Sequence, residues 1–165
     1  MKILYVNGIK FKKMPSRTYQ LLKKAMKDDE VYQCEWVYGD DVKEKIDECI
    51  ERVKPDVIVA SSTAGLFVTD YDIPVILINP VVDRQDLEDL FPDKDFSNYP
   101  EKPSKKSNRI SVILGENDKV LDYKKAMEFF DNADIRIVKD EHQLNNIEPV
   151  IKELNILKKE WSGLC

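Results

Sequence analysis

The length, composition and charge of the chain indicate a folded protein rather than a disordered one. Its 165 residues suit one domain, and a 42% hydrophobic fraction is enough to form a core. A net charge of −5 argues against a nucleic-acid partner, because such binding uses a basic face. No apolar run approaches the roughly 18 residues of a membrane span. The apolar start of the sequence stops at Asn7 and Gly8, too early for a signal peptide, so we expect a cytoplasmic protein.

Six short apolar runs alternate with stretches in which apolar residues recur at helical spacing. The runs predict strands at residues 3–6, 31–37, 57–60, 75–78, 110–114 and 135–138. The spacing predicts helices through Tyr19, Leu22 and Met26 and at residues 42–53, 121–130 and 147–161, with Ser16 and either Asp40 or Asp41 as N-caps. Because most of the strands are apolar throughout, we expect a sheet covered on both faces. The sequence therefore predicts an α/β fold with three layers and a mostly parallel, six-stranded sheet.

One long stretch interrupts this alternation. Residues 91–109 contain three prolines and many polar side chains, which argues against a regular helix or a central strand. Long loops in compact domains are often functional, so this stretch is a candidate lid or binding loop, and a solvated connector is equally compatible with its composition.

Cysteine and histidine are both scarce in this sequence. The three cysteines, Cys34, Cys49 and Cys165, are odd in number and form no CxxC pair, so we expect neither a disulfide framework nor a zinc site, and no cofactor. His142 is the single histidine. Any chemistry that needs an imidazole must therefore use this residue.

Three side chains that suit ester hydrolysis follow three different predicted strands. A serine pair, Ser61 and Ser62, follows residues 57–60, while Asp118 and His142 follow the last two strands. Functional groups gather at the carboxyl ends of strands in open α/β sheets, and Ser, Asp, His is the order of the α/β-hydrolase triad. A serine hydroxyl needs a base to remove its proton, and a carboxylate fixes the tautomer of a histidine base. The order and placement together predict a serine hydrolase that cleaves a small-molecule ester.

Each of these residues also has an ordinary structural interpretation. The nucleophile pattern is Gly-x-Ser-x-Gly, whereas Ala60 and Ala64 stand at the glycine positions here and Gly65 comes one residue later. The serines could cap a helix, Asp118 could belong to a turn, and His142 could be an ordinary surface histidine. Their conjunction at ordered strand ends favours the hydrolase interpretation.

Five segments resemble the YqiA/YcfP-like small esterases, which are compact bacterial members of the α/β-hydrolase superfamily. Residues 3–9 resemble the opening strand and the His-Gly-Phe-like oxyanion turn of that family, and residues 59–65 resemble its Gly-Ser-Ser-Leu-Gly-Gly elbow. Further similar segments are Val-Ile-Leu-Ile-Asn-Pro at 75–80, Gly-Glu-Asn-Asp-Lys-Val-Leu-Asp-Tyr at 115–123 and Asp-Glu-His-Gln-Leu at 140–144. The resemblance implies a minimal α/β-hydrolase fold over residues 1–165, with a short cap or loop segment at about 81–108.

The resemblance also implies roles for individual residues. Ser62 is implied as the nucleophile, Asp118 as the acid and His142 as the base. The backbone N–H groups of Thr63 and Ile9 are implied to form the oxyanion hole. The chain departs from the family pattern at Asn7, where many relatives have histidine, and at the two elbow alanines.

Rival residues and the substrate-binding wall complete the predicted site. Asp122 is a rival acid and Ser61 is a rival nucleophile, whereas Asp140 is too near His142 in sequence to be its acid partner and could at best orient it. We expect Gly8, Phe11 and Leu66 to contribute to substrate binding, together with Ile9 and the 81–108 segment.

Two other classes of protein are compatible with parts of the pattern. One is a hydrolase-like binding or regulatory module with weak or no catalytic activity, because the elbow lacks its glycines. The other is a flavodoxin-like nucleotide binder, which the absence of a glycine-rich loop after the first strand disfavours.

Overall fold

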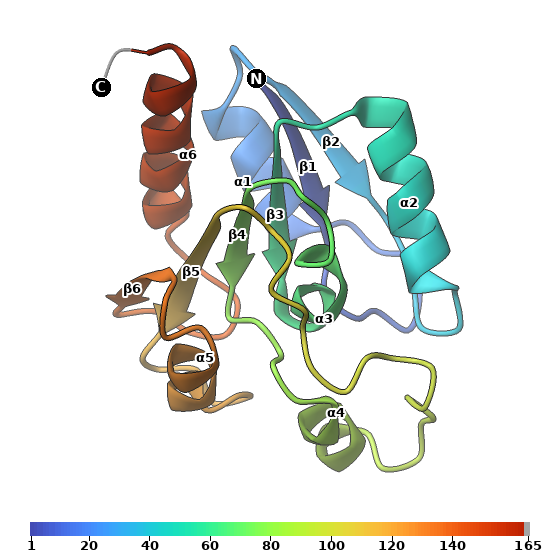
Figure 1. Ribbon diagram of the computed structural model, residues 1–165. Coiled ribbons are helices and arrows are strands. Elements are labelled where there is room, and N and C mark those ends of the chain that lie inside the picture. The colour runs from blue at the N-terminus through green and yellow to red at the C-terminus, as the bar shows by residue number, and fades with distance from the viewer. Residues whose placement is uncertain (164–165) are drawn as a thin grey trace.

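A parallel six-stranded sheet forms the centre of the computed structural model, which describes residues 1–163 (Figure 1). The strand order is β2-β1-β3-β4-β5-β6, and every neighbouring pair is parallel. The strands are β1 (Lys2–Val6), β2 (Glu30–Cys34), β3 (Val57–Ser61), β4 (Val75–Ile78), β5 (Ile110–Gly115) and β6 (Asp134–Val138). The predicted parallel α/β sheet is therefore confirmed.

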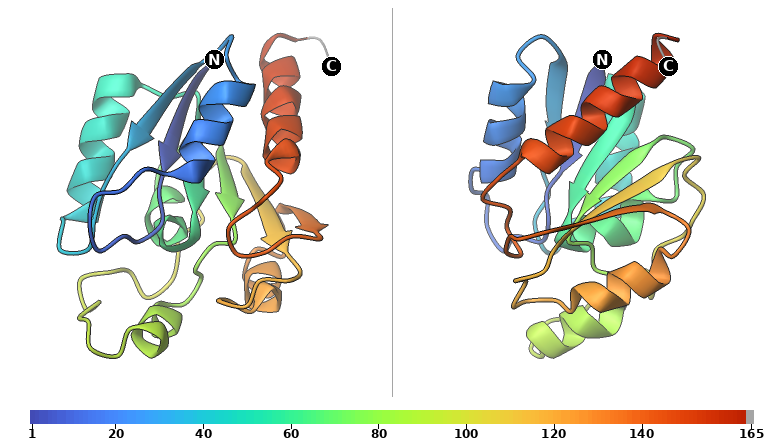
Figure 2. Two further views of the ribbon diagram at one scale, coloured as in Figure 1. Left: turned by 180° about the vertical axis from the view of Figure 1, so that it is seen from behind. Right: turned by 90° about the vertical axis from the view of Figure 1, so that its left-hand side faces the viewer.

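Helices cover both faces of this sheet. They are α1 (Arg17–Ala25), α2 (Val42–Val53), α3 (Gly65–Val68), α4 (Arg84–Leu90), α5 (Tyr123–Phe129) and α6 (Glu148–Trp161), with a 3-10 turn η1 (Ser62–Ala64) before α3. Helices α1 and α6 pack on one face, and α2, α3 and α5 pack on the other (Figure 2). Within residues 1–163, no helix is long and apolar enough to cross a membrane.

The two-sided cover explains why the strands are apolar throughout. Successive side chains of a strand point to opposite faces, so Leu4 and Val6 join the core under α2 and α3 while Ile3 and Tyr5 join the core under α1 and α6. All four are almost fully buried. A strand with water on one face would alternate apolar and polar residues instead.

The predicted helix starts agree with the structure. Ser16 caps α1 by accepting a hydrogen bond from the N–H of Tyr19, and Asp41 caps α2 by accepting one from Glu44. Asp40, the alternative cap, accepts a hydrogen bond from the N–H of Val37 instead.

The second strand is shorter than predicted. We expected it to span residues 31–37, but β2 ends at Cys34. Trp36 leaves the sheet and is buried beside the end of β1, where its indole N–H donates to the carbonyl oxygen of Asn7 at 2.8 Å. Burial of this large side chain overrides the alternating pattern that suggested a longer strand.

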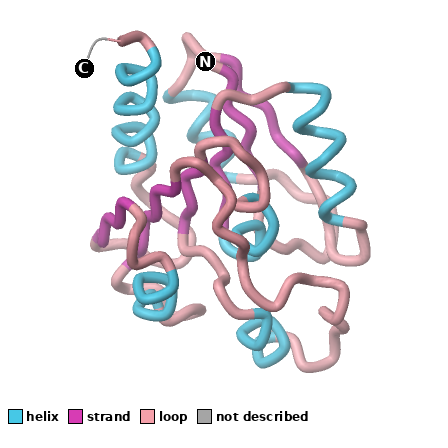
Figure 3. Tube along the Cα trace, viewed as in Figure 1, coloured by secondary structure: helices cyan, strands magenta, loops and turns pink. Residues whose placement is uncertain are grey.

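The proline-rich stretch at residues 91–109 contains no helix or strand, as predicted (Figure 3). It is nevertheless anchored to the protein, because Phe96 and Tyr99 are buried and their rings pack edge to face at 5.3 Å. Arg84 also donates a hydrogen bond to the carbonyl oxygen of Tyr99. The short helix α4, which precedes this loop, was not predicted from the sequence.

The strand order creates a crevice at one point of the sheet. After β1 the chain passes to β2 on one side and then returns to β3 on the other side of β1. Ligands of open α/β sheets bind at the carboxyl ends of the strands at such a reversal. The segments that leave β1 and β3 here are residues 7–10 and the Ser61–Ser62 pair.

Candidate active site

Ser62 lies at a sharp turn between β3 and η1. Its φ angle is +53°, one of three positive φ values among the non-glycine residues of the described chain. Ser61 before it is still extended, and the chain turns into a helix directly after it. The carbonyl oxygen of Ser62 accepts a hydrogen bond from the N–H of Val81 at 3.0 Å. This bond holds the strained turn against the segment that follows β4.

The elbow avoids crowding without glycines at its usual positions. Both elbow alanines are fully buried in the core. The close approaches occur instead at Gly8, where an added Cβ would lie 3.1 Å from the Cβ of Ser62, and at Gly65, where it would lie 2.7 Å from the Cβ of Pro80. The space that this turn requires is therefore provided by Gly8, in the segment after β1, and by Gly65, the first residue of α3.

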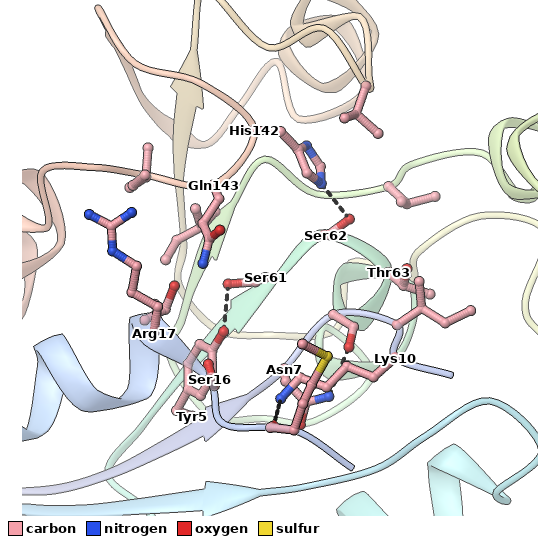
Figure 4. A pocket seen from close by; sticks show the side chains of 18 of the residues that line it. Tyr5, Asn7, Lys10, Ser16, Arg17, Ser61, Ser62, Thr63, His142 and Gln143 are labelled. Carbon is pink, nitrogen blue, oxygen red and sulfur yellow. Dashed lines mark hydrogen bonds between the residues drawn. The ribbon is translucent and has the colours of Figure 1, made fainter. Parts of the chain in front are cut away.

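Ser62, His142 and Asp118 form one continuous hydrogen-bonded chain. His142 Nε2 lies 3.0 Å from Ser62 Oγ, and His142 Nδ1 lies 2.7 Å from Asp118 Oδ2 (Figure 4 shows the first contact). The neutral tautomer that satisfies both contacts carries its proton on Nδ1, which then donates to Asp118. The Asp118 side chain is 1% exposed and that of His142 is 24% exposed, so the imidazole can be reached from the solvent.

The surroundings of Asp118 keep its carboxyl group ionised. Burial by itself would raise the pKa of Asp118, but the hydrogen bond from His142 and those from backbone N–H groups outweigh burial and lower this pKa below its ordinary value. The N–H groups are those of Val120 and Leu121, which reach Asp118 Oδ1 at 2.8 and 3.0 Å. One carboxylate oxygen thus faces the imidazole and the other is fixed to the backbone.

Asn79 holds the loop that carries His142. Its side-chain amide nitrogen donates to the carbonyl oxygens of Glu141 at 3.0 Å and His142 at 2.7 Å, while its Oδ1 accepts from the N–H of Gly115 at 2.8 Å. Asn79 is buried and has a φ of +43°. The sequence signalled this residue only as part of an Asn-Pro pair at a strand end, and its role was not predicted.

A second group of contacts fixes the same loop. Gly115 allows it to pass close to β5, because a Cβ at that position would lie 2.5 Å from the carbonyl oxygen of Asp140. The Asp140 carboxylate accepts hydrogen bonds from the N–H groups of Glu141, Asn145 and Asn146. Asp140 therefore orders the backbone on either side of His142, as an orienting residue would.

The rival residues form hydrogen bonds elsewhere. The hydroxyl group of Tyr5 donates to Ser61 Oγ at 3.1 Å. Asp122 caps α5 by accepting a hydrogen bond from the N–H of Lys124. The structure therefore brings Ser62, rather than Ser61, and Asp118, rather than Asp122, to the imidazole.

A cavity of about 380 Å³ lies over Ser62 and His142. Its wall includes three residues expected near the reaction, Gly8, Ile9 and Thr63. A further part of the wall comes from the end of α4 and the residue after it, through Leu87, Leu90 and Phe91.

Two residues that were expected to bind substrate are not part of this wall. Leu66 is buried in the core, because α3 turns it away from the cavity and toward the sheet. Phe11 is 47% exposed and packs against Phe91, with their ring centroids 5.0 Å apart. Phe11 thus packs against a residue of the wall but does not itself line the cavity, which corrects the expected role in substrate binding.

Asn7 stands where many relatives of the predicted family have histidine. Its buried side-chain amide donates to the carbonyl oxygens of Gly8 at 2.8 Å and Trp36 at 3.1 Å. These bonds fix the backbone of the turn after β1. In this chain the residue therefore acts on the shape of the turn that carries Ile9.

The described cysteines lie away from the cavity. Cys34 and Cys49 are buried free thiols, and Cys165 lies outside the described residues. Within residues 1–163 no three His, Cys, Asp or Glu side chains are grouped so as to hold a metal ion.

Comparison with solved structures defines the class of fold. A carboxylesterase of the ammonia-oxidising thaumarchaeon Nitrososphaera gargenis is similar to this chain with a TM-score of 0.64 and 14% sequence identity, over 96% of this chain and 91% of the other. The fold is therefore that of an α/β-hydrolase, as predicted.

Comparison with family models gives a more specific match. Residues 89–159 match the model of a family described as "Uncharacterised protein family (UPF0227)", the YcfP/YqiA-like esterase family. The predicted resemblance is confirmed by this match. A search of the curated proteins finds no match. Both matches agree with the predicted fold and the predicted resemblance.

Proposed function

We propose that the protein is a serine hydrolase that cleaves a small carboxylic ester, or a thioester, through an acyl-enzyme. The observation that carries this proposal is the hydrogen-bonded chain from Ser62 Oγ through His142 to Asp118, with contacts of 3.0 and 2.7 Å. Both distances lie within the range in which a proton can be transferred. No other histidine is present to act as the base.

In the first half of the proposed reaction, Ser62 Oγ attacks the carbonyl carbon of the ester while His142 Nε2 takes the hydroxyl proton. Asp118 stabilises the imidazolium ion that forms. The tetrahedral intermediate then expels the alcohol or thiol, which receives the proton from His142. In the second half, water attacks the acyl-Ser62 carbonyl, His142 takes a proton from this water and returns it to Ser62, and the carboxylic acid leaves.

The backbone N–H groups of Ile9 and Thr63 are proposed to stabilise the oxyanion. Thr63 follows the nucleophile in the first turn of η1, where N–H groups have no acceptor within the helix. The close contact between Gly8 and Ser62 brings the turn that carries Ile9 to the same side of the cavity. Two donors, one from the segment after β1 and one from η1 after β3, would then converge on one oxygen.

The protein is proposed to form one α/β-hydrolase domain in which residues 81–108 act as a short cap. In support, Leu87 and Leu90 of α4 and the adjacent Phe91 line the cavity, and the rest of the segment packs on the body of the protein through Phe96. A cap of this size covers one side of the site only. A small substrate is therefore expected.

The alternative function is a binding or regulatory module with the same fold and weak or no catalytic activity. That alternative predicts a nucleophile and a base that stand beyond hydrogen-bond reach. The 3.0 Å contact between Ser62 and His142 favours catalysis.

Hydrolysis of p-nitrophenyl butyrate tests the proposal. Because the triad acts as a unit, Ser62→Ala and His142→Ala should each lower kcat by about 10³-fold or more. Ser162→Ala, an exposed serine on the C-terminal side of α6, is the matched control and should keep full activity. Absence of hydrolysis by the wild type, or equal hydrolysis by Ser62→Ala, would contradict the proposal.

A further inference from the structure

The wall of the cavity over Ser62 is basic although the protein as a whole is acidic. The chain has 31 Asp and Glu residues against 26 Lys and Arg residues. Among the described residues that line the cavity there is no Asp or Glu, whereas Lys10 and Arg17 both take part. The two cations come from different parts of the wall, one from the turn after β1 and one from the start of α1 (Figure 4). Lys10 and Arg17 thus give the wall itself an excess of positive charge.

Arg17 has most of its hydrogen-bonding capacity free. A guanidinium group has five N–H donors, and the bond that Arg17 forms is a long one of 3.3 Å to the side-chain oxygen of Asn145. Within residues 1–163 no carboxylate lies within 4 Å of it, whereas Arg84, Arg109 and Arg136 each contact at least one. Arg17 is thus a solvent-accessible cation at the cavity without a protein counter-ion.

Among the described residues, no carboxylate lies within 4 Å of the Lys10 ammonium group either. Its ammonium group donates to the carbonyl oxygen of Met14 at 2.7 Å, which uses one of three donors. Partial burial lowers the pKa of Lys10, and the charge of Glu35 acts in the opposite direction. Lys10 directly follows Ile9, and both residues line the cavity.

We propose that the substrate of this site is a small ester that carries a carboxylate at the end of its acyl chain, and that Arg17 binds this carboxylate. The inference rests on the hydrolase function proposed above and adds the chemical class of the substrate. The planar guanidinium group can bind a carboxylate with two parallel, charge-assisted hydrogen bonds, which a neutral group does not offer. Lys10 adds to the positive potential that attracts the anion.

A matched pair of esters tests the inference. The anionic ester is the mono-p-nitrophenyl ester of glutaric acid, and its neutral isostere is p-nitrophenyl 5-methylhexanoate. The ratio of kcat/KM for the anionic ester to that for the neutral ester should exceed one in the wild type. Arg17→Gln should lower this ratio about tenfold, because a charged hydrogen bond is lost. Lys10→Gln should lower it by a smaller factor.

A control and a salt series separate local binding from net charge. Lys24→Gln changes the net charge equally, on the same helix as Arg17 but outside the cavity, and should leave the ratio unchanged. Raising the ionic strength from about 50 mM to about 500 mM should lower the wild-type ratio, because exposed charges are screened. Equal ratios in Arg17→Gln and Lys24→Gln would overturn the inference, while hydrolysis of the neutral ester would leave the proposed function standing.

A binding measurement keeps the inference independent of turnover. Calorimetric titration of the Ser62→Ala variant with monomethyl glutarate should show binding that is weaker in the Ser62→Ala, Arg17→Gln double variant. If the wild type hydrolyses neither ester but this difference is found, the anion site stands and the hydrolase function fails. Equal or absent binding in both variants would overturn the inference. Tighter binding of methyl phosphate than of monomethyl glutarate would also overturn it, because the site would then select phosphate.

Discussion

Replacing Asn79 with alanine tests how the His142 loop is held. The change removes three hydrogen bonds from a buried position, those to Glu141, His142 and Gly115. At about 1 kcal/mol for each bond and about 1 kcal/mol more for alanine at a positive φ, the free energy of unfolding should fall by about 4 kcal/mol. For a protein of this size the Tm should then fall by about 10 °C.

The same substitution should affect catalysis through the position of the imidazole. Asn79 does not line the cavity, so KM for a neutral ester should change little. A displacement of the base by about 1 Å should lower kcat by about 100-fold. Asn79→Gly separates the two causes, because glycine accepts the positive φ without strain and loses only the hydrogen bonds.

Thermal unfolding and steady-state hydrolysis of p-nitrophenyl butyrate measure both effects. Asn155→Ala, an exposed position on α6, is the control. A Tm of Asn79→Ala within about 3 °C of this control, together with an unchanged kcat, would refute the assigned role. A lower Tm with an unchanged kcat would show that Asn79 contributes to stability but not to catalysis.

Three other substitutions test separate parts of the account. The lowered pKa of Asp118 stabilises the fold above the unfolded-state pKa of about 4, and this stabilisation is lost as the pH falls below that value. Asp118→Asn should therefore flatten the fall in unfolding free energy between about pH 5 and pH 3, measured with urea, and an unchanged slope would contradict this. Gly65→Ala should destabilise the protein by about 1–3 kcal/mol, because the new Cβ would meet Pro80 at 2.7 Å, and an unchanged Tm would show that this contact relaxes freely. Glu153→Ala should cost about 2 kcal/mol, because it removes the buried acceptor that Ser111, Arg109 and Arg136 share, while esterase activity is retained at temperatures below the new Tm.

The strands of the sheet could be predicted from the sequence because each one is marked by a local pattern. Each strand is a short run of apolar residues, and each predicted cap, such as Ser16 and Asp41, acts on an N–H two or three residues away. Helix α4 escaped prediction because it is short and buries one residue, Leu87, so it has no repeating apolar face.

The alignment of Ser62, Asp118 and His142 could be predicted because the fold class determines where strand ends meet. The supporting residues could not, since their contacts join distant parts of the chain. Asn79 bonds to groups 36, 62 and 63 residues further on. Gly8 leaves room for the turn at Ser62, which is 54 residues further along the chain. Such contacts depend on the register between neighbouring strands and not on any local pattern.

Whether a residue lines the cavity also depended on details that the sequence does not contain. Leu66 follows the nucleophile closely, but the rotation of α3 directs it into the core. Phe11 lies in the loop after β1, but its ring packs behind Phe91. The rotation of α3 thus decides whether Leu66 faces the cavity or the core.

Covalent labelling tests the central claim most directly. A fluorophosphonate probe reacts with a serine hydroxyl that a neighbouring histidine activates, and digestion with mass spectrometry identifies the modified residue. The account predicts stoichiometric labelling of the wild type on Ser62, none on Ser61, no labelling of Ser62→Ala, and strongly slowed labelling of His142→Ala. Labelling on another residue, or an unlabelled wild type that is correctly folded, would contradict it.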